Sequence, residues 1–169
     1  LITLGLDSVV VRDIVQDPSK KEETLGATFW LKVLGGCTSL LLAVGSIIVL
    51  RPNEPLTIGL VTILAAGGIF QSFETIDVWF QSQVQSKYTV FAKNIAFICI
   101  VLLKVKLITM QAPLIAFAWA GFAEMGLGAI ALTFVYRFKG YSLKLWRWNF
   151  PRAKSLLKES FPLLLSGLT

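Results

Sequence analysis

The stretch PLTIGLVTILAAGGIFQSF, residues 55–73, decides the fold of this chain because none of its 19 residues is ionisable. A helix needs about 20 mostly apolar residues to cross the hydrocarbon layer of a bilayer, which is about 30 Å thick. Two further stretches are similar, since residues 25–50 hold only Lys32 and residues 107–136 hold only Glu124. The sequence therefore predicts several membrane-spanning helices rather than one soluble core.

The composition supports this interpretation and excludes several kinds of site. Of the 169 residues, 55% are hydrophobic and 15% are charged, whereas soluble domains are about 45–50% apolar and about 25% charged. The chain has no histidine, which excludes Ser-His-Asp and Cys-His catalysis and HExxH zinc sites. Cys37 and Cys99 lie far apart in separate apolar runs, so they indicate neither a disulfide framework nor a CxxC site.

We predict an all-α, polytopic membrane helix bundle with four complete transmembrane helices and a truncated helix at each end. The breaks between the spans are the two prolines of RPNEP, the polar run QVQSKY and the turn before Pro113. Ser160 and Pro162 indicate the start of the last, truncated helix. We therefore expect residues 1–169 to be an internal piece of a larger membrane protein. The predicted spans are Thr24–Leu50, Leu56–Gln83, Thr89–Leu107 and Pro113–Tyr136.

Basic residues in the loops predict the orientation. If the four helices alternate, 11 Lys and Arg residues fall on one side of the membrane and 3 on the other. Because basic short loops resist translocation, the first side is predicted to be cytoplasmic and the protein to be a multi-pass cell membrane protein. On the other side, Lys104 and Lys106 are expected to anchor the helix end at the outer interface.

Residues 140–160 are predicted to form a cytoplasmic amphipathic segment. Trp146, Trp148 and Phe150 alternate with cations, which is typical of a segment that lies on an anionic leaflet. A basic, aromatic patch can also bind nucleic acid, but beside a membrane span we expect no nucleic acid partner. One helical face is shared by Ala153, Leu156, Leu157 and Ser160.

Glu124 is the most informative charged residue because it lies twelve residues from either end of the run 112–136. It is therefore about 18 Å from both surfaces, too deep for a short side chain to reach water. Ala120, Gly121 and Gly128 share its face, where small residues admit a second helix or leave room for a cavity. Two roles stay open: a carboxyl that ties two helices together, and a titrating carboxyl used in ion coupling or substrate contact.

Three cations lie where lipid or an interface is expected. Lys32 is about 12 Å inside its predicted helix, Lys93 is shallower, and Arg12 ends the first apolar run. Each is either an anchor that extends to the interface or a cation that faces a central cavity. A cationic vestibule on the cytoplasmic side would suit an anionic headgroup.

The cytoplasmic end of the second predicted span carries polar residues at spacings of three and four, with Asp77 alongside. This polar stripe is either a helix emerging into solvent or the lining of a vestibule between helices. Its members are Gln71, Glu74, Gln81 and Gln85.

Several segments together resemble one transporter family. They are LGLDSVVVRDIV (4–15), PSKKEE (18–23), TLGATFWLKVLGG (24–36), FQSFETIDVWFQSQVQSKY (70–88) and KSLLKESFPLLLSGL (154–168). They resemble bacterial polysaccharide flippases of the O-antigen type, in the multidrug/oligosaccharidyl-lipid/polysaccharide exporter superfamily. The resemblance covers essentially the whole chain and implies that residues 1–169 are part of an N-terminal lobe, from the end of helix two to the start of helix seven.

The resemblance implies transport by alternating access. An undecaprenyl-diphosphate-linked oligosaccharide would move from the cytoplasmic to the outer leaflet with no bond made or broken, so neither an enzyme, a catalytic residue, a metal nor a cofactor is expected. The implied partners are the bilayer, the lipid-linked oligosaccharide, a C-terminal lobe of the same chain and polysaccharide assembly proteins. The implied substrate-binding residues are Arg12, Lys32, Lys93, Gln71 and Gln81, and the polar or coupling positions are Glu74, Asp77 and Glu124.

Two alternatives stay open. A multidrug cation antiporter of the same superfamily would favour an acidic, aromatic cavity, whereas Lys32 and Lys93 are embedded here. A membrane glycosyltransferase or glycan polymerase would normally need catalytic motifs in long external loops, and the predicted loops are only a handful of residues.

Overall fold

The computed structural model describes the backbone of residues 2–166 and the side chains of residues 6–160, and every regular element in this part is helical. This confirms the predicted all-α class. In chain order the elements are α1 (Ile2–Gln16), η1 (Pro18–Lys20), α2 (Lys21–Leu50), α3 (Pro55–Gly67), η2 (Gly68–Glu74), α4 (Thr75–Ser82), α5 (Lys87–Thr109), α6 (Leu114–Phe138), η3 (Leu143–Leu145) and α7 (Phe150–Ser166).

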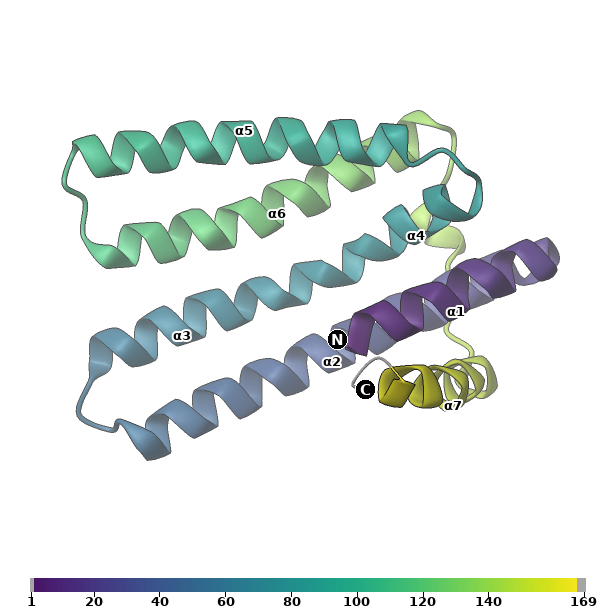
Figure 1. The fold of residues 1–169 in the computed structure, drawn as a ribbon, viewed down its shortest axis with the longest axis horizontal. Coiled ribbons are helices and arrows are strands. Elements are labelled where there is room, and N and C mark those ends of the chain that lie inside the picture. Colours follow the sequence, from purple (N-terminus) through teal and green to yellow (C-terminus); the bar gives the residue numbers. More distant parts are fainter. Residues whose placement is uncertain (1, 167–169) are drawn as a thin grey trace.

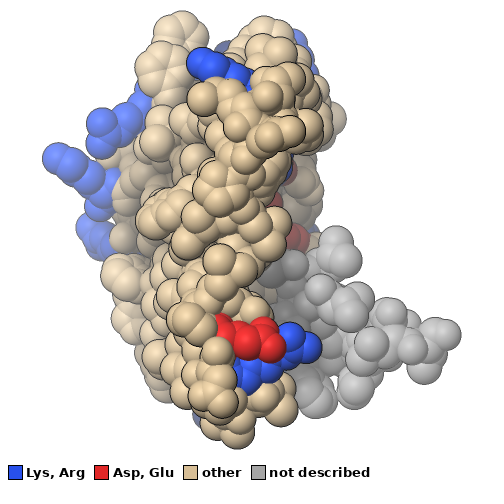
Figure 2. Space-filling model, turned by 90° about the vertical axis from the view of Figure 1, so that its left-hand side faces the viewer, with Lys and Arg blue, Asp and Glu red and all other residues tan. Residues whose placement is uncertain are grey.

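The long helices form antiparallel hairpins that lie side by side (Figure 1). α2 pairs with α3, α5 pairs with α6, and α6 packs against α3, while α1 and α7 lie against the first half of α2. The turns at 51–54 and 110–113 lie at one end, and the other three connections lie at the opposite end. Most of the surface at the first end is uncharged (Figure 2). The alternation assumed in the charge count is therefore present, and which end faces the cytoplasm stays a prediction.

Three helical stretches are long and apolar enough to cross a membrane: residues 18–50, 55–82 and 114–138. They contain, to within one residue at an end of two of them, three of the four predicted spans. The fourth predicted span corresponds to α5, a 23-residue helix that carries four lysines, and its passage through the membrane stays a prediction. Large apolar side chains are exposed along these helices, among them Val49 and Phe134, as expected for surfaces that contact lipid.

The second predicted span contains an unexpected 3-10 stretch. We expected one α-helix over Leu56–Gln83, but η2 interrupts it from Gly68, the second residue of the glycine pair Gly67 and Gly68. The glycine pair permits close packing here: a Cβ on Gly67 would lie 2.7 Å from the sulfur of Met125 on α6. A 3-10 helix has about three residues per turn, so the polar stripe counted at α-helical spacing does not stay on one face.

The most deeply buried core lies at the end of the molecule where α1, α4 and α7 meet the ends of α2 and α6. It contains Ile14 of α1, Phe80 of α4, Leu132 of α6 and Leu156 of α7, each at most 2% exposed. Toward the opposite end the helices bury less, and no residue in the most apolar window of residues 18–50 is buried. Folding energy from burial is therefore concentrated at the end that carries most of the connections.

The amphipathic segment at 140–160 is only partly as expected. Ala153, Leu156 and Ser160 are buried against protein rather than presented to a leaflet, while Leu157 of the same predicted face is 50% exposed. Trp146 also turns inward, where its indole N–H donates to the hydroxyl of Tyr136 at 3.1 Å. The helix α1 supplies the apolar surface that covers this face, and the sequence pattern does not distinguish such a surface from lipid.

The predicted helix start at Ser160 and Pro162 is wrong. The backbone is already helical from Phe150, with Pro151 in the first turn where its missing N–H is tolerated, and α7 continues to Ser166. The hydroxyl of Ser160 does not cap a helix but donates to the carbonyl oxygen of Leu157 at 3.1 Å within the same helix. The side chain of Pro162 lies outside the described residues.

Gly26 of α2 should be required for docking of the α6–α7 connection. A Cβ at this position would lie 2.3 Å from the carbonyl oxygen of Arg147, which belongs to backbone held by a hydrogen bond from its own N–H to Glu22. We expect Gly26→Ala to destabilise the full-length protein by about 1–3 kcal/mol through overpacking. Thermal unfolding in detergent measures the effect.

Gly45→Ala in the same helix is the matched control, because nothing lies within 4 Å of a Cβ there. Alanine favours a helix over glycine by up to about 1 kcal/mol, so this variant should keep or raise Tm. Equal Tm values for the two variants would contradict the close contact at Gly26.

Candidate functional site

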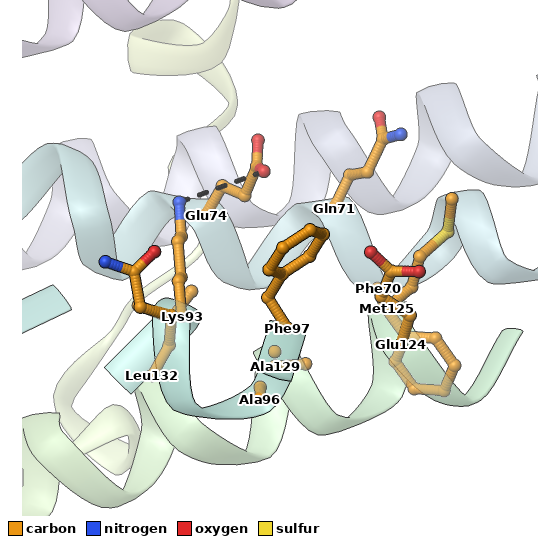
Figure 3. A pocket seen from close by; sticks show the side chains of 12 residues that line it. Phe70, Gln71, Glu74, Lys93, Ala96, Phe97, Glu124, Met125, Ala129 and Leu132 are labelled. Atoms are coloured by element: carbon orange, nitrogen blue, oxygen red, sulfur yellow. Dashed lines mark ion pairs between the residues drawn. The ribbon is translucent and has the colours of Figure 1, made fainter. Parts of the chain in front are cut away.

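A cavity of about 360 Å³ with several polar lining residues lies between η2, α5 and α6 (Figure 3). Small residues make room for it, since Ala96 of α5 faces Gly128 and Ala129 of α6 across the cavity wall. Aromatic rings from both sides line it, Phe70 from η2 and Phe97 from α5. Its polar lining residues are Gln71, Glu74, Lys93, Asn94 and Glu124.

Lys93 is the cation of this cavity, and it is held by two carboxylates. Its Nζ lies 2.8 Å from Oδ2 of Asp77 and 4.0 Å from Oε1 of Glu74. The other oxygen of Asp77 accepts a short hydrogen bond from the hydroxyl of Thr89. Asp77 is 18% exposed and Lys93 35% exposed, so the pair joins α4 to α5 at a partly buried position.

Glu124 lies at the other side of Phe97 in the same cavity (Figure 3). Its Oε2 pairs with Nζ of Lys104 at 2.6 Å, which joins α6 to α5. We expected Lys104 to anchor the helix end at the outer interface, and this is wrong. The long side chain of Lys104 extends along the hairpin instead, because a carboxylate in an apolar helix stabilises a cation more than an apolar surface does.

Both uses expected of the small residues around Glu124 are present. A Cβ on Gly121 would lie 3.2 Å from a methyl of Leu64, so α3 approaches α6 closely there. Gly128 instead lines the cavity. The face that bears Glu124 is therefore shared between a helix contact and an open volume.

Lys32 is buried away from this cavity. Its Nζ lies 2.7 Å from Oδ1 of Asp7 on α1, and its side chain is only 3% exposed. The angles of this ion pair are poor for a hydrogen bond, so it is mainly a charge contact. Between the two roles left open for Lys32, an interface anchor does not fit such burial.

Arg12 also lies away from the cavity, in a network that joins α1 to α7. Its guanidinium contacts Asp13 at 3.0 Å and makes a short ion pair with Glu159. Asp13, in turn, contacts Arg152 of α7 at 3.1 Å. Arg12 therefore helps to fasten α7 and is already neutralised.

The structure thus brings together half of the eight residues predicted for a site. The cavity is lined by Gln71, Glu74, Lys93 and Glu124. Asp77 is not in the lining, but it pairs with Lys93. Gln81 is exposed and does not line the cavity. Because the 3-10 stretch has a different number of residues per turn, Gln81 on α4 does not lie on the same face as Gln71. The predicted vestibule that gathers Arg12, Lys32 and Lys93 is not present in the described part of the chain.

Several lining residues were not singled out from the sequence. Asn94 carries an available signal, an amide beside Lys93 in an apolar helix, whereas Phe70, Phe97 and Met125 look like any membrane-facing apolar residue. With two carboxylates and one ammonium in its lining, the cavity is not cationic. Hydroxyl groups are suitable ligands because carboxylate and amide oxygens accept hydrogen bonds from them. Among the described residues, no group of three or more acidic or cysteine side chains is placed to hold a metal ion.

The Lys93–Asp77 contact should be measurable as a coupling energy. We expect Lys93→Gln and Asp77→Asn each to destabilise the full-length protein, because each removes one partner of a partly buried ion pair. The double variant should lose less than the sum, with a coupling of about 1 kcal/mol. Thermal unfolding of the three variants measures it, and strictly additive losses would rule out an energetic contact.

One comparison with known proteins identifies a family. The sequence profile of the family described as polysaccharide biosynthesis protein matches residues 1–169, the whole of the chain. No curated protein and no solved structure matches it. With apolar helices long enough to cross a membrane, the chain is that of a membrane protein with a role in polysaccharide biosynthesis or export. The chain belongs to the polysaccharide biosynthesis protein family.

Proposed function

We propose that this chain is part of a flippase that moves an undecaprenyl-diphosphate-linked oligosaccharide from the cytoplasmic to the outer leaflet of the cell membrane by alternating access. The observation that carries the proposal is a cavity with five polar lining residues between η2, α5 and α6 of a polysaccharide biosynthesis protein. Alternating access also needs a second helix bundle, which we assign to a C-terminal lobe of the same polypeptide. Polysaccharide assembly proteins would supply and receive the substrate.

The cavity is better suited to the sugar part of such a substrate than to its diphosphate. Gln71, Glu74 and Asn94 offer hydrogen-bonding groups for hydroxyls, and Phe97 offers an apolar surface for a sugar ring. Lys93 is the one cation in the lining, and Asp77 holds it. We therefore assign the diphosphate to groups outside this cavity and no longer assign it to Lys32 or Arg12.

A non-enzymatic role is supported by the shortness of the connections. The turns at 51–54, 83–86 and 110–113 have four residues each, too few to carry a catalytic loop of their own. Translocation makes and breaks no bond, so it requires a polar path through the bilayer rather than an activated nucleophile.

A cation antiporter remains the second candidate because of one observation. Glu74 and Glu124 line the cavity together with Phe70 and Phe97, which is the acidic, aromatic lining expected for organic cations. The family match supports the flippase instead. Cells that lack the gene should keep their drug resistance but lose surface polysaccharide, and the opposite result would support the antiporter.

Lys93→Gln should reduce glycan export because it removes a charged hydrogen-bonding group from the cavity. A hydrogen bond to a charged group is worth about 1.5–3 kcal/mol, so we expect a loss of about tenfold or more. The assay uses cells in which the full-length variant replaces the native protein, and it measures surface polysaccharide together with lipid-linked precursor. A flippase defect accumulates the precursor, whereas an enzymatic defect depletes it.

Asp77→Asn is the matched control for Lys93→Gln, since it breaks the same ion pair but leaves the ammonium, with Glu74 at 4.0 Å, in the cavity. It should keep most of the export at equal protein level. Equal loss in both variants would mean that the ion pair matters only for stability.

Glu124 should matter for more than its ion pair with Lys104. We expect Glu124→Gln and Lys104→Gln each to lower Tm, and the double variant to recover much of that loss because neither charge is left unpaired. Export should stay reduced by about tenfold in the double variant, because the carboxylate is missing from the cavity. If the double variant recovered export as well as Tm, the only role of Glu124 would be to tie α5 and α6 together.

A further inference from the structure

The segment from Lys144 to Lys158 presents an outer face that the proposed function does not use. On α7, Phe150, Lys154, Leu157 and Lys158 are exposed. Their spacing of four, three and one places them on one side of the helix, next to the buried residues that pack on α1. The preceding connection adds exposed Leu145 and Trp148. The outer face therefore mixes large apolar side chains with cations.

The cations of this outer face have no acidic partners in the described part of the chain. No ion pair involves any of them, although the same segment pairs Arg152 with Asp13. The acid next to the segment, Glu159, is engaged, because Ser155 and Arg12 hydrogen-bond to it and hold its pKa below the usual range. The positive charge of the outer face is therefore not neutralised by acidic residues in the described part of the chain. Its cations are Lys144, Arg147, Lys154 and Lys158.

Hydrogen bonds attach the segment to the bundle, so the segment is already ordered before a partner binds. Asn149 donates to Glu23 at 2.9 Å, and Arg152 donates to the hydroxyl of Thr24 at 3.1 Å. The backbone N–H of Arg147 donates to Glu22 at 3.3 Å. A partner that binds this face need not order the segment first.

We propose that the outer face of residues 144–158 binds anionic phospholipid headgroups of the bilayer leaflet at this end of the bundle. The segment follows directly after α6, which is long and apolar enough to span the membrane, so it lies at headgroup depth. Unpaired cations beside exposed Trp148, Phe150 and Leu157 match the charge of such a leaflet and the apolar layer beneath it. This inference does not depend on the flippase proposal.

The test is lipid selectivity of the full-length protein in phosphatidylcholine bilayers, measured by spin-label restriction of phosphatidylglycerol relative to phosphatidylcholine. Lys154→Gln combined with Lys158→Gln should lower the preference for phosphatidylglycerol by about fivefold. High salt should reduce the same preference in the native protein, because it screens exposed charges. Both lysines are exposed and unpaired, so Tm should not change.

Arg51→Gln combined with Lys106→Gln is a control of equal charge, since it removes two exposed cations from the opposite end of the bundle, of which Arg51 pairs with Glu54. It should leave most of the preference intact. The proposal is overturned if the α7 variant keeps the native selectivity, or if the two double variants lose it equally. It is also overturned if an acidic peptide or nucleic acid binds the face while the lipid preference is absent.

Discussion

Three lysines in the apolar helices of this chain are each held opposite a carboxylate on a neighbouring helix. Lys32 pairs with Asp7, Lys93 with Asp77, and Lys104 with Glu124. An unpaired charge in an apolar surrounding is strongly unfavourable, so removing either partner is more damaging than never having had the pair. These contacts therefore fix which helices are neighbours: α1 with α2, α4 with α5, and α5 with α6. Apart from these charges the helix surfaces are mostly apolar, and apolar surfaces alone do not favour one neighbouring helix over another.

The same constraint shapes the cavity. Lys93 has two carboxylates within 4.0 Å, Asp77 on α4 and Glu74 on η2, so a small shift between these elements would exchange partners without leaving the ammonium unpaired. The 3-10 stretch lies where such a shift would occur, and its hydrogen-bond geometry is weaker than that of an α-helix. In the transport cycle that we propose, contacts of this exchangeable kind would let the helices rearrange without leaving a charge unpaired.

Buried residues and ion pairs between α1 and α7 are distributed unevenly along the length of the molecule. The buried core and the α1–α7 ion pairs lie together at the end with most of the connections, while the opposite half holds exposed apolar helices and short turns. A lipid solvent explains this division, because helices in a bilayer need not bury their apolar surface against one another. At the end that carries most of the connections, burial of Ile14, Phe80 and Leu156 stabilises the fold in the ordinary way.

The sequence by itself determined the all-α class, the breaks between the helices and the unusual position of Glu124, because the absence of charge over about 20 residues and the position of prolines are local properties. It did not reveal that Lys104 extends to Glu124, that Lys32 faces Asp7, or that Arg12 fastens α7. Those partners are far apart in the chain and follow no spacing rule. The register of Gln71 against Gln81 likewise depended on the 3-10 stretch, which the sequence did not reveal. Only the tertiary structure decided which charges meet, because a buried cation is satisfied by whichever carboxylate the packing brings within its reach.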